Sequence, residues 1–187
     1  MTGVITALRS DHNNMSQLLD ILDEQFQVLQ SGERPDYEVI TGIMEYCLTY
    51  PDLYHHPKED LVFRALRARR PEAVETLGDL ESLHAELGAL TRRLAAAVRQ
   101  IQEGAEMDRG AVVGLAKDFI DSYRHHIEME ETHFFPVAEN HLIAEDWADI
   151  QRDLRVAEDP LFSASEVGDL QDLRRKVLRW YEPGASA

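Results

Sequence analysis

Apolar residues recur at alternating steps of three and four along the first 140 residues, which is the period of amphipathic α-helices. Helix-ending and helix-starting residues interrupt this pattern three times, so it predicts four long helices. The expected boundaries are an end at Gly32, a start at Pro35 and Asp36, a third helix from Pro71 to near Gly104, and a start after Asp108. Short connections place neighbouring helices antiparallel. The pattern therefore predicts an all-α fold, an up-down-up-down four-helix bundle.

Two features modify this simple bundle. Pro51 and Pro57 lie inside the second helix and predict a kink or a break, because proline lacks the N–H group that a helix needs. Beyond about residue 140 the pattern weakens, and residues 144–157 and 166–180 are candidates for one or two additional C-terminal helices. We expect a bundle domain at residues 1–142 and a helical extension at residues 143–187. The extension would pack on the bundle or mediate association, for example in a homodimer.

Composition narrows the class of ligand. The 187 residues include 19 Lys and Arg against 35 Asp and Glu, a formal net charge of −16, so most of the surface would repel nucleic acid and anionic membranes. We expect neither as a partner, and a cation is the more natural ligand. The lone Cys47 excludes an intramolecular disulfide framework and a thiolate metal cluster. The sequence shows neither a signal peptide nor an apolar stretch long enough to span a bilayer, so we expect a cytoplasmic protein.

Six polar residues fall on helix faces that are otherwise apolar: His12, His55, Glu59, His84, His126 and Glu130. A single histidine on such a face is usually a hydrogen-bonded core residue. A histidine followed by an acid four positions later is also a weak signal in a chain with 35 acids. The six residues together need another explanation.

Their positions relative to the predicted turns, near residues 34, 71 and 105, supply one. His12 lies 22 residues before the first turn and His55 lies 21 after it, while His84 lies 21 before the third turn and His126 lies 21 after it. Because antiparallel helices rise at the same rate per residue, equal distances from a shared turn give equal heights. The two halves of the chain also repeat these residues at an offset of 71 or 72. This pseudo-twofold pattern predicts two equivalent metal ions at one level of the bundle.

The residue types fit that chemistry. Residues four apart on a helix share a face, so a histidine and a glutamate can bind one ion together, and a carboxylate can bridge two ions. Four imidazoles and two carboxylates suit iron, or manganese, better than a four-coordinate structural zinc. Buried carboxylates also need cations beside them, because an unpaired buried charge is very costly.

Two histidine doublets leave the choice of ligand open. Positions 55, 59, 62 and 66 read His, Glu, Val, Leu, whereas positions 56, 60, 63 and 67 read His, Asp, Phe, Arg, so the row of His55 is the more apolar. The same comparison favours His126 over His125. We therefore expect His56 and His125 to be solvated, to support a ligand through a hydrogen bond, or to serve as an additional ligand.

Other polar neighbours of the six residues have expected roles outside the ligand set. Tyr54 and Tyr123 lie within about one helical turn of the ligands and would orient them, complete a site, or simply pack in the core. His133 is expected to hydrogen-bond near the site. Asp60 and Glu131 are expected to be ordinary solvated charges.

Three local motifs resemble the haemerythrin-like family, also called HHE cation-binding domains. They are Ser10-Asp11-His12, the run from Tyr54 to Phe63 that contains His-His-Pro-Lys-Glu, and His126-Ile-Glu-Met-Glu130 followed by Phe134-Phe135-Pro136. The resemblance covers roughly residues 5–140. It implies two iron ions with a bridging oxo or hydroxo group. Members of the family carry dioxygen, sense oxygen or iron, respond to nitric oxide or peroxide, or supply iron to damaged clusters.

One departure from the family's oxygen carriers shapes the functional hypothesis. The carriers have a second histidine on the third helix where this chain has Gly88, and an aspartate five positions after the last histidine where this chain has Glu130 after four. We therefore expect a di-iron protein that binds or reduces a small oxidant, such as dioxygen, peroxide or nitric oxide, in redox or nitrosative stress. The alternatives are a non-enzymatic oxygen or iron sensor or an iron store that signals through a partner, and a helical interaction module without metal.

Overall fold

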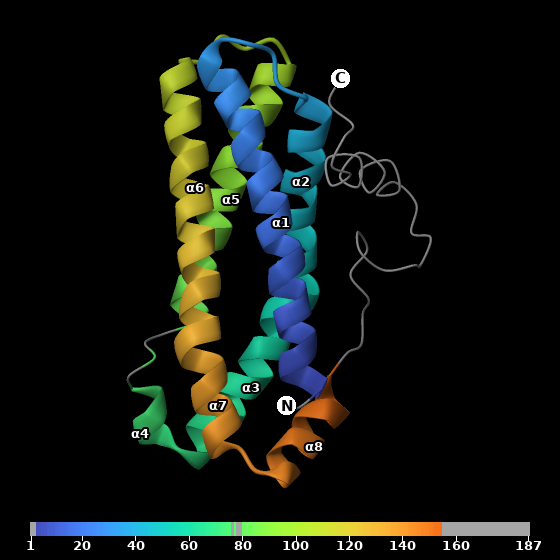
Figure 1. Ribbon diagram of the computed structural model, residues 1–187, viewed down its shortest axis with the longest axis vertical. Helices are drawn as coiled ribbons and strands as arrows, with labels where there is room; N and C mark the ends of the chain where they lie inside the picture. Colours follow the sequence, from blue (N-terminus) through green and yellow to red (C-terminus); the bar gives the residue numbers. More distant parts are fainter. Residues whose placement is uncertain (1–2, 76, 78–79, 155–187) are drawn as a thin grey trace.

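A computed structural model of the chain describes residues 3–75, 77 and 80–154. Within these residues all regular structure is helical, and four long rods lie side by side (Figure 1). The first rod is α1 (Gly3–Ser31); the second is α2 (Tyr37–Tyr50), the π-helical turn η1 (Pro51–His55) and α3 (His56–Arg69); the third is α5 (Leu80–Gln102); the fourth is α6 (Arg109–Met129), the π-helical turn η2 (Glu130–Phe134) and α7 (Phe135–His141). Successive rods run in opposite directions, and α1 and α5 each contact both α2 and α6. The predicted all-α four-helix bundle is confirmed.

The connections between rods form where the sequence signals predicted them. Gly32 and Gly104 adopt φ angles of +94° and +88°, a left-handed conformation that favours glycine at the end of a helix. The residue after each glycine donates its N–H to the carbonyl five residues earlier, at 3.2 Å and 2.9 Å. Asp36 and Asp108 cap the next helices by accepting the N–H three residues on, at 3.1 Å and 2.8 Å. These local bonds fix where each rod turns back.

The second rod continues through Pro51 without a break. Its backbone widens there into the π-helical turn η1, in which the N–H of His56 donates to the carbonyl of Pro51, five residues earlier. Pro57 has no N–H group, so the α-helical hydrogen bond from residue 57 to the carbonyl four residues earlier cannot form. The irregularity predicted at the prolines therefore takes the form of a π turn, a feature that is frequent at functional sites.

The third rod does not begin at Pro71, as the sequence pattern predicted. Pro71 instead starts a separate short helix, α4 (Pro71–Val74), and the long helix α5 begins at Leu80. The N–H of Leu77 bonds to the carbonyl of Val74, only three residues earlier, at 2.9 Å. This tight turn ends α4, because the i→i+4 ladder of an α-helix is not continued there.

Two apolar clusters fill the bundle, and a polar layer separates them. One cluster extends from the layer to the end of the bundle that holds Gly32 and includes Leu22, Ile43 and Phe119. The other lies toward the opposite end and includes Leu66 and Phe134. Along each rod the two clusters occupy consecutive stretches, and most buried polar residues of the described chain lie between them: Asp11, His12, His55, His56, Glu59, His126 and Glu130.

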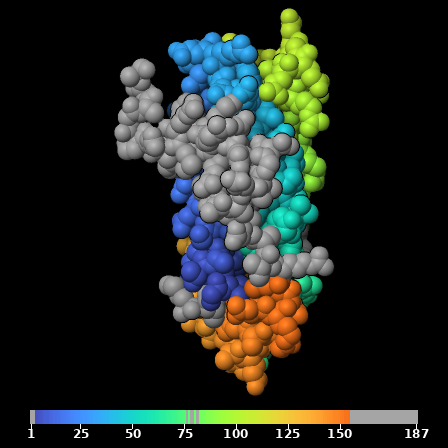
Figure 2. Space-filling view, turned by 90° about the vertical axis from the view of Figure 1, so that its right-hand side faces the viewer, coloured from blue at the N-terminus to red at the C-terminus, as the bar shows by residue number. Residues whose placement is uncertain are grey.

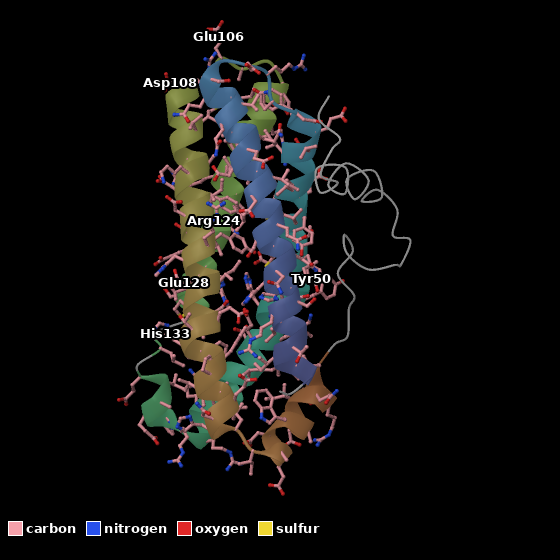
Figure 3. The ribbon with its side chains drawn as sticks, viewed as in Figure 1. Tyr50, Glu106, Asp108, Arg124, Glu128 and His133 are labelled. Atoms are coloured by element: carbon pink, nitrogen blue, oxygen red, sulfur yellow. The ribbon has the colours of Figure 1, made fainter. Side chains whose placement is uncertain are left out.

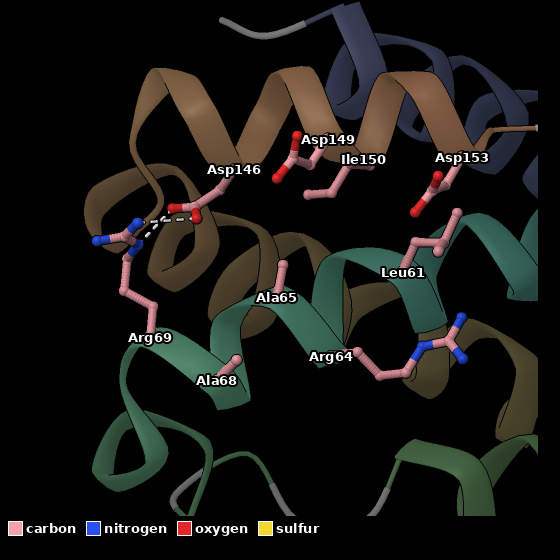
Figure 4. Close-up of a pocket in the computed structure, with 9 residues that line it drawn as sticks. All are labelled: Leu61, Arg64, Ala65, Ala68, Arg69, Asp146, Asp149, Ile150 and Asp153. Atoms are coloured by element: carbon pink, nitrogen blue, oxygen red, sulfur yellow. Dashed lines mark hydrogen bonds and ion pairs between the residues drawn. The ribbon is translucent and has the colours of Figure 1, made fainter.

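Helix α8 (Ala144–Asp153) packs against α3 at the end of the bundle where α1 begins (Figures 1 and 2). Its Ile150 is buried, and its Asp146 pairs with Arg69 across a hollow between the two helices (Figure 4). This part of the expected extension therefore lies on the bundle, whereas the second expected helix, 166–180, lies outside the described residues. No helix in the described part of the chain combines the length and the apolar character needed to cross a membrane.

Candidate metal centre

The six residues that the sequence pattern singled out lie together in the polar layer. They come from all four rods: His12 from α1, His55 from η1, Glu59 from α3, His84 from α5, His126 from α6 and Glu130 from η2. The two carboxylates are completely buried, with 0% of their surface exposed. Counting residues from the turns therefore predicted the height of each side chain correctly.

The side chains form two groups that share a carboxylate. In each group, one ligand atom per residue lies within 4.8 Å of all the others; the groups are His12, His55, Glu59 and Glu130, and His56, Glu59, His84 and His126. Glu59 Oε1 lies 3.1 Å from His55 Nε2, while its Oε2 lies 3.5 Å from His84 Nε2. Glu130 is similarly placed, with Oε2 3.3 Å from His12 Nε2 and Oε1 3.5 Å from His84 Nε2. Each carboxylate thus faces both groups.

Many of these polar atoms have no hydrogen-bond partner. They include all four carboxylate oxygens of Glu59 and Glu130 and the Nε2 atoms of His56, His84 and His126, all of which are buried. Buried polar atoms are normally hydrogen-bonded, and a buried carboxylate is especially unfavourable unless positive charge lies beside it. The donor atoms that converge without partners are the nitrogen and oxygen atoms that would bind a metal cation.

The pKa values reflect the same crowding of charge. Burial opposes the imidazolium of His12, but the glutamates around it outweigh burial and raise its pKa to about 11. Burial also opposes ionised Glu59, yet neighbouring histidines, His55 first, hold its pKa well below the usual value. Burial lowers the pKa of His126 to about 4, against the attraction of Glu130. In the metal-free protein, protons on histidine therefore balance part of the negative charge that a cation would otherwise balance.

His56 adds a fifth imidazole to the layer. Its ring is buried and stacks on His84, with centroids 4.0 Å apart and an interplanar angle of 13°. The sequence comparison treated His55 and His56 as competitors for one inward position, but the structure turns both toward the carboxylates. The two residues lie on either side of the junction between η1 and α3, where the wider π turn makes the spacing of an α-helical face inapplicable.

Carboxylates contact the outward nitrogens of three of these histidines. His12 Nδ1 lies 2.8 Å from Glu131 Oε1, and His56 Nδ1 lies 3.2 Å from Asp52 Oδ1. A carboxylate in this position fixes which ring nitrogen carries the proton and leaves the other nitrogen free to bind metal. The prediction of a solvated charge at Glu131 was wrong, because this residue also pairs with Arg9 at 3.0 Å. Sequence reasoning did not assign a role to Asp52.

Asp11 supports His55 in the same way and was also missed. Its Oδ2 lies 3.1 Å from His55 Nδ1 and accepts a hydrogen bond from Lys58 Nζ at 3.2 Å, while its Oδ1 accepts one from the Tyr50 hydroxyl at 3.2 Å. A signal for this residue was present in the sequence, because Asp11 interrupts the apolar row at positions 4, 8, 15, 18 and 22. A buried aspartate at that point of the row requires a partner.

Comparison with known families agrees with this geometry. The family model of the haemerythrin HHE cation-binding domain matches residues 3–138. This range begins with α1, ends within α7 and contains every residue of the polar layer. The chain belongs to the haemerythrin HHE cation-binding domain family. The resemblance inferred from the motifs is thus confirmed. No curated protein matches the chain.

The donor set of this HHE domain suits a metal cation. Five imidazoles and two carboxylates provide nitrogen and oxygen donors at two adjoining positions, and several of these atoms have no other partner. The only cysteine, Cys47, is buried in one of the apolar clusters, so no thiolate takes part. The residues present therefore fit the cation-binding role that defines the family.

Three of the other candidate residues lie outside the donor groups of the HHE domain. His125 and Tyr54 are exposed to solvent. His133 is exposed as well, on the outer side of the bundle (Figure 3), and its Nδ1 lies 2.7 Å from the Thr132 hydroxyl. The structure therefore does not place these side chains against the carboxylates.

Tyr123 is buried beside the layer but does not reach the carboxylates. Its hydroxyl donates to Met15 Sδ at 3.4 Å, and its ring centroid lies 6.3 Å from that of His126. Burial raises the pKa of this hydroxyl well above its usual value. Tyr123 thus packs against a histidine of the HHE domain as a neutral side chain.

Proposed function

We propose that this HHE domain binds two iron ions joined by an oxo or hydroxo bridge, and that it binds or reduces a small oxidant in redox or nitrosative stress. The oxidant would be dioxygen, peroxide or nitric oxide. One observation carries the proposal: the four oxygens of Glu59 and Glu130 are buried between five imidazoles without a hydrogen-bond partner.

The number and type of donors favour two redox-active ions over one structural ion. A structural zinc is satisfied by four ligands, whereas the layer offers seven side chains in two adjoining groups. Mixed imidazole and carboxylate donors suit iron, and the absence of thiolates from the two groups argues against an iron–sulfur cluster or a copper(I) site. Two bound irons would supply a redox couple able to exchange electrons with a small oxidant.

The chain's own residues would hold and tune this centre. Glu59 and Glu130 would bridge the two ions, because each carboxylate already faces both groups. Asp11, Glu131 and Asp52 would keep the outward nitrogens of three histidines protonated, so that the inward nitrogens bind metal. The apolar clusters on both sides of the layer would limit the access of water.

Metal analysis and an absorption spectrum of the full chain, purified with iron, test the proposal. We expect about two irons per chain, with charge-transfer bands that change on addition of peroxide or nitric oxide. His84→Ala should lose iron and those bands while it keeps its helix content. His133→Ala, a change at an exposed histidine outside both groups, should keep them. Two irons with an unchanged spectrum in the His84 variant would refute the ligand set, and turnover of peroxide would separate a redox role from a sensing role.

A further inference from the structure

A small apolar pocket opens between α5 and α6 beside the polar layer. Its volume is about 200 Å³, and it is lined by Leu83, Glu86, Leu87 and Leu90 from α5 and by Ser122, His125, His126 and Met129 from α6, of which Glu86 and His125 are exposed to solvent. A water molecule occupies about 30 Å³ in the liquid, so the pocket can hold a few molecules of that size. It is smaller than the roughly 300–1,000 Å³ typical of sites for organic ligands. The dimensions and lining therefore suit small molecules of low polarity.

A single side chain, that of His126, lies between the pocket and the candidate metal centre. His126 lines the pocket, although only 7% of that residue is exposed. The Nε2 atom of His126 lies 3.2 Å from Glu130 Oε2, so this edge of the ring faces the carboxylates. Its Nδ1, on the other side of the ring, is buried and has no hydrogen-bond partner. One imidazole ring therefore separates the pocket from the buried carboxylates.

The outward nitrogen of His126 differs from those of three other histidines in the layer. The Nδ1 atoms of His12, His55 and His56 each lie within 3.2 Å of a carboxylate, and two of those carboxylates also pair with Arg9 or Lys58. Charged side chains thus cover these approaches, whereas the approach to His126 is lined mostly by apolar side chains, with the exposed Glu86 as its acidic residue. In a chain of net charge −16, an apolar approach favours neutral molecules over anions.

We propose that this pocket binds small neutral oxidants and is their entrance to the metal centre. The inference rests on the proposed function, because an entrance to the carboxylates has this use only if metal ions are bound there. Leu83, which is 39% exposed, lies at the mouth. The ring of His126, which lines the pocket, lies against the ring of His84, with their centroids 5.0 Å apart. An oxidant that passes these rings reaches Glu59, which both groups share, and Glu130.

Tryptophan substitutions on the two walls test the entrance. Ser122→Trp changes an exposed residue of α6, and Leu83→Trp changes a partly exposed residue of α5, so each blocks the pocket from a different helix. Leu53→Trp is the matched control, because Leu53 is 61% exposed and lines a separate hollow beside Tyr54 and Lys58. The probe is nitric oxide, mixed with the reduced, iron-loaded full chain in a stopped-flow instrument, and iron content is measured for every variant.

We expect each pocket variant to bind nitric oxide about tenfold more slowly, as for an association limited by access, with iron content and absorption spectrum unchanged. The control should keep the wild-type rate. If the folded, iron-loaded pocket variants bind at the wild-type rate, or if only the control is slowed, the entrance is refuted while the di-iron proposal stands. If wild-type protein binds no iron, both proposals fail. If Ser122→Trp does not fold, the rate measured for Leu83→Trp tests the entrance.

Discussion

Asp11→Asn should weaken metal binding far more than Asp52→Asn, although the two aspartates do the same task. Each carboxylate contacts the outward nitrogen of one histidine, at 3.1 Å for His55 and 3.2 Å for His56. Their surroundings differ, because the side chain of Asp11 is 10% exposed and that of Asp52 is 48% exposed. Asparagine keeps the size of the side chain and removes its charge, so the pair of variants isolates the effect of burial.

The expected magnitudes follow from these surroundings. Loss of a buried carboxylate behind a metal-binding histidine typically lowers metal affinity about 10- to 100-fold, or roughly 1.4–2.7 kcal/mol. Asp11 also accepts hydrogen bonds from Lys58 and Tyr50, so its replacement disturbs the whole set of contacts behind His55. An exposed ion pair is worth only about 0–1 kcal/mol because water and salt screen it, which corresponds to less than about fivefold for Asp52→Asn.

Competition between the full-length apoprotein and a chelator for Fe²⁺, under anaerobic conditions, measures both affinities. Circular dichroism before and after thermal unfolding shows whether each variant retains the helical fold. Equal losses of affinity in the two variants, or a larger loss in Asp52→Asn, would refute the reasoning from burial. Wild-type affinity in Asp11→Asn would show that the His55 ring is held by other contacts.

Three further predictions concern charge, protons and packing. Glu59→Gln removes the carboxylate common to both groups, so metal analysis should show loss of both ions rather than one. His12, with a pKa of about 11, carries a proton at neutral pH that metal must displace; affinity should therefore rise with pH up to about 11, and calorimetry in different buffers should detect the released proton. Leu22→Ala, at a fully buried position outside the polar layer, should lower unfolding free energy by about 2–5 kcal/mol in denaturant titrations while iron content stays unchanged.

The features that the sequence predicted well are those set by local signals. Gly32, Asp36, Gly104 and Asp108 end or start rods through bonds to residues at most five positions away, so their effect can be read from the chain itself. Once the turns are placed, the regular rise of the α-helix fixes the height of every side chain. The six polar residues therefore met where residue counting put them.

Features that depend on irregular backbone or on contacts between rods could not be predicted this way. The π turn before His56 changes which side chains share a face, so a comparison of α-helical rows favoured His55 and left the role of His56 open. Glu131 has the spacing and polarity of a surface residue, and only the approach of Arg9 and His12 from another rod reveals its contacts. The separate helix at Pro71 was missed because proline is equally favourable at the first turn of a short or a long helix.

The same irregularity shows why the two halves of the domain are not equivalent. An offset of 71 residues relates His55 to His126 and Glu59 to Glu130, but it relates His56 to Ile127, a buried residue of an apolar cluster. The π turns also lie differently relative to the two His–Glu pairs. The turn η1 ends at His55 and so precedes Glu59, whereas η2 begins at Glu130, after His126. One group therefore has three imidazoles and the other has two. Two ions bound here would have unequal donors, so the symmetry of the sequence repeat does not extend to the chemistry of the centre.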